Sequence, residues 1–516
     1  MKNTISSVLL GMFFTACSLT MEAQQTNIQV NYKDARHVIN PNIYGHFAEH
    51  LGRCIYGGFF VGDTSSIPNT NGVRNDVVAA LKTLKIPVLR WPGGCFADTY
   101  HWKDGIGPKE KRPAIVNRWW GGVTEDNSFG VHDFLNMCEL LNTEPYLAGN
   151  IGSGTVQELA DWVQYVNTNT KNPMSDLRKQ NGREKPWNVK FWGVGNEAWG
   201  CGGNMTPEYY TGEYRKYATF MADWSNTDKI FRVASGANST DYKWTETIMK
   251  NIPNQMVEGV ALHHYSVIDW GAKGPSTDFT EQQYFITMQR ALQMDSLVIK
   301  HSAIMDKYDP KKKIALIVDE WGGWYDVEPG TNPGFLYQQN TIRDAMIAGV
   351  TLNIFNNHAD RVRMANLAQA INVLQAVILT DKEKMILTPT YHVMEMFNVH
   401  QGATMLPVSF KTNNYVFNGK KLAAVSVSAS KDSTGAVHLS LVNIDPAKAQ
   451  KITFNTGDEK VAGITGRILA SGKLQDYNSF TEPAKVKPEA FTGAVLNNNT
   501  VTVSLPPASV VVLTIK

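Results

Sequence analysis

The stretch VKFWGVGNEAWGCGG, Val189–Gly203, decides how the chain is expected to fold. A run of β-branched and aromatic residues ends in Gly195, Asn196 and Glu197, and a glycine-rich bend follows. An apolar run of this length, bounded by glycine, predicts a buried strand. Its last residue would deliver a carboxylate to a cleft.

A second stretch, KIALIVDEWGGW at Lys313–Trp324, repeats the pattern and ends its apolar run in Asp319 and Glu320. Low dielectric and a neighbouring charge can move the pKa of a carboxyl group at such a position, which acid/base chemistry at neutral pH requires. An ordinary polar strand end is the simpler interpretation of either glutamate alone. That interpretation is less convincing for the two glutamates together, because tryptophan and glycine lie close to both Glu197 and Glu320. Aromatic side chains beside paired carboxylates suggest a sugar ring as substrate.

Length and composition describe a large globular protein. The 516 residues are too many for one small core and predict two or three domains, or one barrel with an accessory domain. Hydrophobic residues make up 43% and charged residues 19% of the chain, and the formal net charge is +2 with no clustered basic run. These values exclude a disordered chain and do not favour nucleic acid or an anionic membrane as partner.

The N-terminus predicts export. The apolar run Val8–Ala16 is too short to span a bilayer and is typical of a secretory signal, here residues 1–23. Simple cleavage near Ala23 and a lipoprotein-type signal with a lipid anchor at Cys17 are the two alternatives. Either would place the protein in the periplasm or outside the cell. No later segment has the pattern of a membrane span.

Strand-like and helix-like runs alternate through the middle of the chain. The expected strands are Ile43–Glu49, Ile86–Trp91, Glu144–Asn150, Val189–Glu197, Ile230–Ser235, Val257–His264, Ile314–Glu320 and Leu352–Asn357. Helical periodicity marks Val73–Lys85, Val131–Leu141, Thr155–Asn167, Thr206–Trp224, Phe279–His301, Tyr337–Ala348 and Met364–Leu379. This alternation predicts a closed (β/α)8 TIM barrel with its chemistry at the C-terminal strand ends. An open doubly wound sheet is the alternative, but no glycine-rich phosphate loop follows an early strand.

Short β-rich runs broken by Asn, Gly, Asp and Pro follow the barrel, which predicts a C-terminal antiparallel β-sandwich. The alternating segment Asn27–Asn40 is expected to add its strand to that sandwich. The expected division is therefore 24–40 for N-terminal strands, 41–380 for the catalytic barrel and 381–516 for the sandwich.

Apart from Cys17, four cysteines remain: Cys54, Cys95, Cys138 and Cys201. They are few for a disulfide-framed fold, and none lies in a CxxC pair that would indicate a metal site. Three pairings into two disulfides are possible, and the sequence does not choose among them.

Six stretches in one order resemble a known family. They are IYGHFAEHLGRCIYGG at Ile43–Gly58, LRWPGGCFADTYHWKDGIGP at Leu89–Pro108, NRWWGGVTEDNSFG at Asn117–Gly130, and then GNEAWGCGGNM, ALHHY and DEWGGWY. In these the chain resembles the α-L-arabinofuranosidases of glycoside hydrolase family 51. The resemblance runs along the barrel and continues into the C-terminal sandwich.

The resemblance implies a retaining mechanism without a cofactor. Glu197 corresponds to the acid/base and Glu320 to the nucleophile, with the two carboxyl groups about 5–5.5 Å apart. Tyr265 is expected to donate a hydrogen bond to Glu320, and a buried ring bonded to backbone is the structural alternative. His263 and His264 are interpreted as packed residues at the barrel rim. Without a third clustered ligand they do not predict a metal.

The resemblance also implies a set of sugar-binding residues. Those expected to hold hydroxyl groups are Glu49, Arg90, Asn196 and Gln369, and those expected to form aromatic walls are Trp120 and Trp324. Arg90 has a second interpretation as an ion-pair partner of Glu49 or Glu320. Trp119 is adjacent to Trp120, and the sequence does not decide which of the two faces the cleft.

One position departs from the family pattern. Many relatives have asparagine after the Pro-Gly-Gly turn, where this chain has Cys95. A thiol is a weak donor, so one sugar contact would be lost or taken by water. Alternatively, Cys95 pairs with Cys54 or Cys201, both expected on the same rim.

The sequence therefore predicts an exo-acting retaining α-L-arabinofuranosidase that trims plant arabinan, arabinoxylan or their oligosaccharides. The family also leads us to expect a homo-oligomer. Another retaining barrel glycosidase, such as a β-glucanase or β-xylosidase, is the alternative enzyme, since the same two glutamates serve many sugars. A carbohydrate-binding protein without catalysis is the alternative from a different class.

Overall fold

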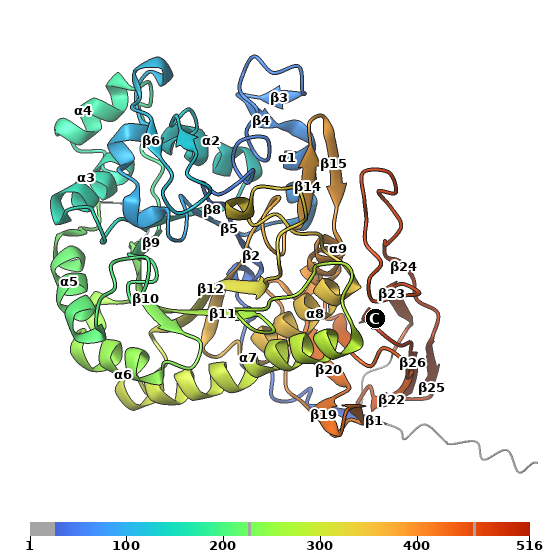
Figure 1. Cartoon of the computed structure of the whole chain (residues 1–516). Coiled ribbons are helices and arrows are strands. Elements are labelled where there is room, and N and C mark those ends of the chain that lie inside the picture. The colour runs from blue at the N-terminus through green and yellow to red at the C-terminus, as the bar shows by residue number, and fades with distance from the viewer. Residues whose placement is uncertain (1–25, 225–228, 458–460) are drawn as a thin grey trace, which may run out of the picture.

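A closed barrel of eight parallel strands forms the larger part of the protein (Figure 1), whose computed structural model describes residues 26–224, 229–457 and 461–516. Neighbouring strands follow the order β10, β11, β12, β13, β2, β5, β8 and β9. The bounds are β2 Gly45–Phe47, β5 Val88–Trp91, β8 Glu144–Gly149, β9 Phe191–Val194, β10 Phe231–Asn238, β11 Gly259–Ser266, β12 Ala315–Gly323 and β13 Val362–Leu367. The expected TIM barrel is confirmed, and the open sheet is excluded.

Helices alternate with the barrel strands along the chain. They are α1 Asn75–Leu84, α2 Val131–Leu141, α3 Val156–Asn167, α4 Pro173–Gln180, α5 Pro207–Phe220, α6 Tyr242–Asn251, α7 Glu281–Tyr308, α8 Ile342–Asn357 and α9 Pro389–Met396. Several begin at a threonine cap: Thr155, Thr206 and Thr280 each accept the backbone N–H three residues on. No helix within the described ranges is long and apolar enough to cross a bilayer.

The prediction of the last barrel strand is wrong. Leu352–Asn357 forms the last six residues of α8. The eighth strand is β13, which begins at Val362 and overlaps the start of the run Met364–Leu379 that was expected to be a helix. The cause is that α8 is buried on every side from Ile342 to Asn356. A helix without a solvent-exposed face has no amphipathic period, so a short part of it resembles a buried strand.

An apolar cluster inside the barrel forms its lower layers: Val88, Tyr146, Phe191, Val233, Ala261, Ala315, Ile317 and Met364. Two residues further along their strands, Arg90, His263 and Asp319 form a polar layer that is also buried. Because side chains alternate along a strand, both layers face the same interior.

A β-bulge in β12 brings Glu320 to the same interior. Ala261 pairs with Ile317 and His263 pairs with Glu320, so two residues of β11 face three of β12. The extra residue turns Asp319 and Glu320, which are consecutive, toward one site.

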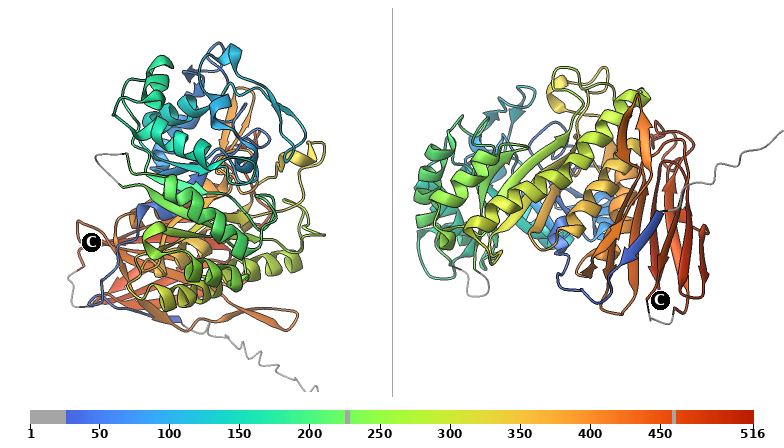
Figure 2. Two further views of the ribbon diagram at one scale, coloured as in Figure 1. Left: turned by 90° about the vertical axis from the view of Figure 1, so that its left-hand side faces the viewer. Right: turned by 90° about the horizontal axis from the view of Figure 1, so that it is seen from below.

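The C-terminal sandwich has two sheets, seen edge-on beside the barrel in Figure 2. One has the order β17-β1-β22-β26-β25 and the other β16-β20-β21-β27-β23-β24. Their bounds are β1 Thr26–Val30, β16 Thr404–Leu406, β17 Val408–Phe410, β20 Val425–Lys431, β21 Val437–Asn443, β22 Gln450–Asn455, β23 Ile464–Ala470, β24 Glu489–Ala490, β25 Ala494–Asn497, β26 Thr500–Leu505 and β27 Ser509–Ile515. The N-terminal β1 pairs antiparallel with β17 and parallel with β22.

Helix α8 joins the barrel to the sandwich. A Cβ added at Gly349 would lie 2.8 Å from Val442, so a residue with no side chain allows the helix to approach the six-stranded sheet closely. On the same helix Asn353 accepts a hydrogen bond from Ser428 at 2.7 Å. Four two-stranded hairpins complete the described structure: β3 Asn69–Thr70 with β4 Val73–Arg74, β6 Ile115–Val116 with β7 Thr124–Glu125, β14 Ile378–Asp381 with β15 Lys384–Leu387, and β18 Asn414–Phe417 with β19 Lys420–Ala423.

Candidate active site

A cavity of about 540 Å³ opens at the C-terminal ends of the barrel strands. The sequence-predicted site residues that line it are Glu49, Cys95, Trp120, Glu197, Tyr265, Glu320, Trp324 and Gln369. Arg90 and Asn196 are not among its lining residues and are buried behind the carboxylates. The strand-end residues thus meet in one place, as the barrel topology requires.

Glu197 follows β9 on a tightly folded loop. Its φ is +39°, which non-glycine residues seldom adopt, and Gly195 before it has φ +80°. The loop is held by two hydrogen bonds: the Asn196 N–H donates to Asp98 at 2.8 Å, and the Ala198 N–H donates to Ser235 at 3.1 Å. The backbone around Glu197 is therefore fixed from both sides.

Glu320 is held through both carboxylate oxygens. Arg90 donates to Oε1 and the Tyr265 hydroxyl donates to Oε2, each at 2.9 Å. Arg90 also donates to Asn196 Oδ1 at 2.6 Å. Arg90 thus has the ion-pair role with Glu320, and Tyr265 makes the contact that was expected of it.

The two glutamates face each other across the cavity. One carboxylate oxygen of Glu197 and one of Glu320 lie within 4.8 Å of each other. Burial raises the pKa of Glu197, the negative charge of Glu320 raises it further, and His263 and Arg90 oppose the shift. Glu197 therefore holds its proton to a higher pH than an ordinary glutamic acid does.

His263 connects the carboxylates and is not a simple packed residue. Its Nδ1 lies 2.9 Å from Glu197 Oε1 and its Nε2 lies 3.1 Å from Asp319 Oδ1. Burial lowers its pKa, but Glu320, Asp319 and Glu197 outweigh burial and raise it to about 10. His263 is therefore a cation at neutral pH with both ring nitrogens donating. Both histidines are buried, as expected, but His263 also bonds two carboxylates, whereas His264 is hydrogen-bonded to Ser239 and the Arg290 carbonyl.

Glu49 is surrounded by donors. The Gly94 N–H and Trp120 Nε1 each donate to its Oε1 at 2.9 Å, and Gln369 donates to Oε2. Burial, followed by the charge of Glu320, raises the pKa of Glu49 to about 7, although these three donors oppose the rise. Glu49 is thus a fixed polar group in the lining of the cavity.

Aromatic rings line the rest of the cavity. Trp120 is part of the wall, whereas Trp119 is not among the lining residues. The guanidinium carbon of Arg118 lies 4.6 Å from the centre of the Trp119 ring. The Trp324 ring lies 5.1 Å from Tyr265 and 5.3 Å from Trp270, both edge to face. These rings offer flat apolar faces to sugar C–H groups.

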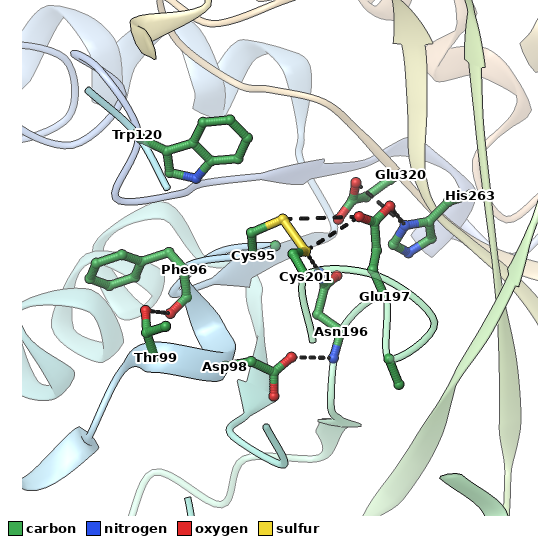
Figure 3. The surroundings of a disulfide bond; sticks show 12 residues. Cys95, Phe96, Asp98, Thr99, Trp120, Asn196, Glu197, Cys201, His263 and Glu320 are labelled. Carbon is green, nitrogen blue, oxygen red and sulfur yellow. Dashed lines mark hydrogen bonds and ion pairs between the residues drawn. A yellow bond between two sulfur atoms is a disulfide. The ribbon is translucent and has the colours of Figure 1, made fainter. Parts of the chain in front are cut away.

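A disulfide joins Cys95 to Cys201 beside Glu197 (Figure 3). It selects one of the pairings that the sequence left open, and Cys54 and Cys138 are free and buried. Cys95 therefore has no thiol hydrogen to donate in this state.

Two groups of potential metal ligands occur in the described residues, and both contain Glu197. In one, Cys95 and Cys201 are consumed by the disulfide. In the other, Glu197 and Glu320 share His263, whose raised pKa keeps it protonated. A protonated imidazole has no lone pair for a metal, so the side chains present do not fit a metal centre.

Four residues were given no role in this site by the sequence: Asp98, Tyr146, His263 and Asp319. Cys201, in contrast, was one of the two partners expected for Cys95. Tyr146 donates to Asp319 at 2.8 Å, and Asp98 accepts three backbone N–H groups. The period of two along each strand was an available signal. It places residues 90, 263 and 319 above the apolar barrel layer.

A closed parallel barrel that holds two carboxylates within 4.8 Å, between aromatic walls, defines a glycoside hydrolase. Comparison with known proteins gives the family. Profiles of the α-L-arabinofuranosidase 1 domain and of the α-L-arabinofuranosidase C-terminal domain match residues 80–282 and 319–509. The chain belongs to the α-L-arabinofuranosidases of glycoside hydrolase family 51, and it is a hydrolase of that activity.

Individual relatives agree along nearly the whole chain. An intracellular exo-α-L-arabinofuranosidase of Bacteroides ovatus is 51% identical, covering 98% of this chain and 99% of the relative. α-L-Arabinofuranosidase C of Emericella nidulans is 33% identical, over 83% and 87%. A crystal structure of the family 51 arabinofuranosidase from Xanthomonas axonopodis pv. citri superposes with a TM-score of 0.94 at 46% identity, over 95% and 100%. That of α-L-arabinofuranosidase from Thermotoga maritima, an arabinose complex, gives 0.84 at 28%, over 95% and 99%.

The expectation of export is wrong by this comparison. The Bacteroides ovatus relative, which matches almost end to end, is named an intracellular enzyme. The predicted secretory signal at residues 1–23, with the lipid anchor at Cys17, lies outside the described residues. A short apolar run is a pattern of composition alone, and it carries less weight than a relative aligned over the whole length.

Proposed function

We propose that the protein is an exo-acting, retaining α-L-arabinofuranosidase in which Glu320 is the nucleophile and Glu197 the acid/base. The observation that carries this proposal is the approach of the two carboxylates to within 4.8 Å, because a retaining mechanism needs carboxyl groups about 5–5.5 Å apart and an inverting one needs more room. The exo mode is supported by the name of the Bacteroides ovatus relative.

The first step follows from how each carboxyl group is held. Arg90 and Tyr265 fix the two oxygens of Glu320, which attacks the anomeric carbon as an anion. Glu197, whose pKa is raised, gives its proton to the leaving oxygen. The products of this step are a covalent arabinofuranosyl-enzyme and the free aglycone.

The second step reverses the proton transfer. Once Glu320 is esterified, its charge no longer raises the pKa of Glu197, which becomes a base. It takes a proton from water, and the water attacks the anomeric carbon. Arabinose leaves with its original anomeric configuration.

We assign the walls of the cavity to the arabinofuranosyl ring. Glu49 and Gln369 would hold hydroxyl groups, Trp120 and Trp324 would pack on the ring, and Asn196 would contact the 2-hydroxyl beside the acid. The disulfide partner Cys95 would contribute shape to this wall and no hydrogen-bond donor.

The cavity extends beyond one ring. Its volume of about 540 Å³ is in the range that holds ligands of several rings, about 300–1,000 Å³. Two further tryptophans line it: Trp199, whose Nε1 donates to the Gly236 carbonyl at 3.1 Å, and the exposed Trp270. These two rings would contact the sugar that carries the arabinose, so arabinan, arabinoxylan and their oligosaccharides are the proposed substrates.

Two variants test the assigned roles. Glu197→Ala is expected to lose about 10²–10⁴-fold in kcat/KM on arabino-oligosaccharides and to keep much of its activity on an aryl arabinofuranoside, whose leaving group needs no proton. Glu320→Ala should lose turnover on both substrates. An equal loss on both substrates for Glu197→Ala would remove it from the acid role.

A panel of substrates tests the sugar and the stereochemistry. We expect hydrolysis of para-nitrophenyl α-L-arabinofuranoside to exceed that of the β-xyloside, with the retained anomer seen first by proton NMR. Faster hydrolysis of the xyloside would favour the β-xylosidase alternative, and binding without turnover would favour a non-catalytic carbohydrate-binding protein.

We also propose a division into residues 24–40, 41–380 and 381–516, and assembly as a homo-oligomer. The division is supported by the separate barrel and sandwich sheets. Light scattering behind size-exclusion chromatography measures the assembly, and a mass near 57.4 kDa would rule it out.

A further inference from the structure

We propose that Cys95 and Cys201 are positioning residues for Glu197, and that closing their disulfide removes a hydrogen-bond donor from the carboxyl group. The proposal rests on the acid/base role of Glu197 proposed above. It makes the proton affinity of the acid depend on whether the two sulfur atoms are oxidised or reduced.

The sulfur atoms lie against one oxygen of Glu197. Cys201 Sγ is 3.5 Å and Cys95 Sγ is 4.0 Å from Oε2, whereas Oε1 is occupied by His263 at 2.9 Å (Figure 3). Disulfide sulfurs carry no hydrogen, so these are contacts and not hydrogen bonds. Oε2 is therefore the side of the carboxyl group that is free to hold the catalytic proton.

The bridge connects two loops that both form the site. Cys95 follows β5 and Cys201 follows β9, at a sequence separation of 106. A second connection runs from Asp98, in the turn after Cys95, to the Asn196 N–H at 2.8 Å. The disulfide is thus a second link between the loop after β9, which carries Glu197, and the loop after β5.

The loop is packed so closely that the bridge has little freedom. A Cβ added at Gly202, next to Cys201, would lie 1.8 Å from the Asn196 carbonyl oxygen and 2.8 Å from Asp98 Oδ2. This packing fixes the backbone that carries Cys201, and Asn196 Nδ2 lies 3.9 Å from the Cys201 sulfur. We therefore expect the sulfur to remain near Oε2 when the bridge is opened.

Reduction changes what the sulfur can do. A dithiol such as dithiothreitol attacks the bridge through its thiolate, the S–S bond breaks, and the reagent leaves as a cyclic disulfide. Its two electrons and two protons remain on Cys95 and Cys201 as thiols. At 3.5 Å the Cys201 S–H can donate to Oε2, which favours the ionised carboxylate and thus a lower pKa.

The other groups facing Glu197 are unchanged by reduction. They are Glu320 on β12, His263 and Tyr265 on β11, and Arg90 on β5. A difference in pH dependence between the oxidised and the reduced enzyme is therefore due to the sulfur atoms. Its effect should be confined to the step in which Glu197 gives up a proton.

The test is the pH dependence of kcat/KM for the full-length enzyme, oxidised and then reduced with dithiothreitol, with free thiols counted in each state. On an arabino-oligosaccharide, we expect reduction to move the alkaline limb to lower pH by about half a unit, the effect of one weak donor. On an aryl arabinofuranoside, the limb should not move. Cys138→Ala, which removes a buried cysteine remote from the site, should respond as the parent enzyme does.

Single substitutions reproduce the reduced state without a reductant. Cys95→Ala leaves the nearer thiol, that of Cys201, beside Oε2, so its alkaline limb should show the full shift. Cys201→Ala leaves the farther thiol, and its limb should shift less. The double variant has neither thiol, and its limb should not shift. Equal alkaline limbs in all four proteins, or a shift of the same size on both substrates, would overturn the proposal. If Glu197→Ala itself fails to discriminate between leaving groups, the acid role fails; if it discriminates but the limbs coincide, only the role of the cysteines fails.

Discussion

Replacing His263 by asparagine removes the cation that lies among three buried carboxylates. In the folded protein the pKa of His263 rises from its ordinary 6.5 to about 10 because Glu320, Asp319 and Glu197 surround it. At about 1.36 kcal/mol per unit, this corresponds to about 5 kcal/mol of favourable interaction. Removing one partner of a buried charge pair costs about 3–5 kcal/mol by itself, which is the same order.

The sign of the pH dependence follows from the direction of the shift. A group whose pKa is higher in the folded than in the unfolded protein stabilises the fold fully below pH 6.5 and loses that effect as pH rises toward 10. The free energy of unfolding should therefore differ between parent and His263→Asn by about 3–5 kcal/mol at low pH, and by about 1–2 kcal/mol one unit below the folded pKa. Urea unfolding followed by fluorescence, at a series of pH values, measures both.

His264→Asn is the matched control on the same strand. Burial lowers the pKa of His264, which contacts a serine and a backbone carbonyl instead of carboxylates. The effect of His264 on the free energy of unfolding should have the opposite pH dependence. At low pH the unfolded chain binds a proton at His264 that the folded protein does not bind, so this residue destabilises the fold there. A destabilisation of His263→Asn that is the same at every pH would refute the electrostatic explanation.

Further predictions concern the pocket, the core and the bridge. Trp120→Phe keeps the ring but removes the donor to Glu49, so kcat/KM on para-nitrophenyl α-L-arabinofuranoside should fall about 10-fold or more; an unchanged value would contradict this role. Ile317→Ala, inside the barrel, should lower the free energy of unfolding by about 2–5 kcal/mol in urea titration, whereas Ile299→Ala on the exposed face of α7 should change it by about 0.5 kcal/mol or less. The Cys95→Ala/Cys201→Ala double variant should lose about 2–5 kcal/mol in the same measurement, since the bridge closes a long loop.

The barrel was predictable because its strands are buried and each ends in a change of composition. Stretches such as Val189–Glu197 combine β-branched residues, a sharp glycine boundary and a polar end, which together mark a strand of a parallel sheet. Helix α8 lacked such a mark, because the barrel covers one side of it and the sandwich the other. The apolar sequence of α8 indicates burial but has no amphipathic period that would identify a helix. The eighth strand was therefore assigned to the end of α8 and not to β13.

The site was predictable where a residue acts from the end of its own strand. Glu197 and Glu320 could be recognised because each lies at the boundary between an apolar run and a loop. The role of His263 depends on the bulge that aligns it with Glu320, and the sequence does not encode such a register shift locally. The partner of Cys95 likewise depends on how two loops approach in three dimensions.

The position of β1 has a consequence for synthesis. This strand lies between β17 and β22, so its partners are residues 408–410 and 452–454 at the other end of the chain. A ribosome must add nearly four hundred residues after Val30 before the first of these partners exists. During that time the barrel can close while its leading segment waits unpaired, and the growing protein carries an open strand edge until its last domain emerges.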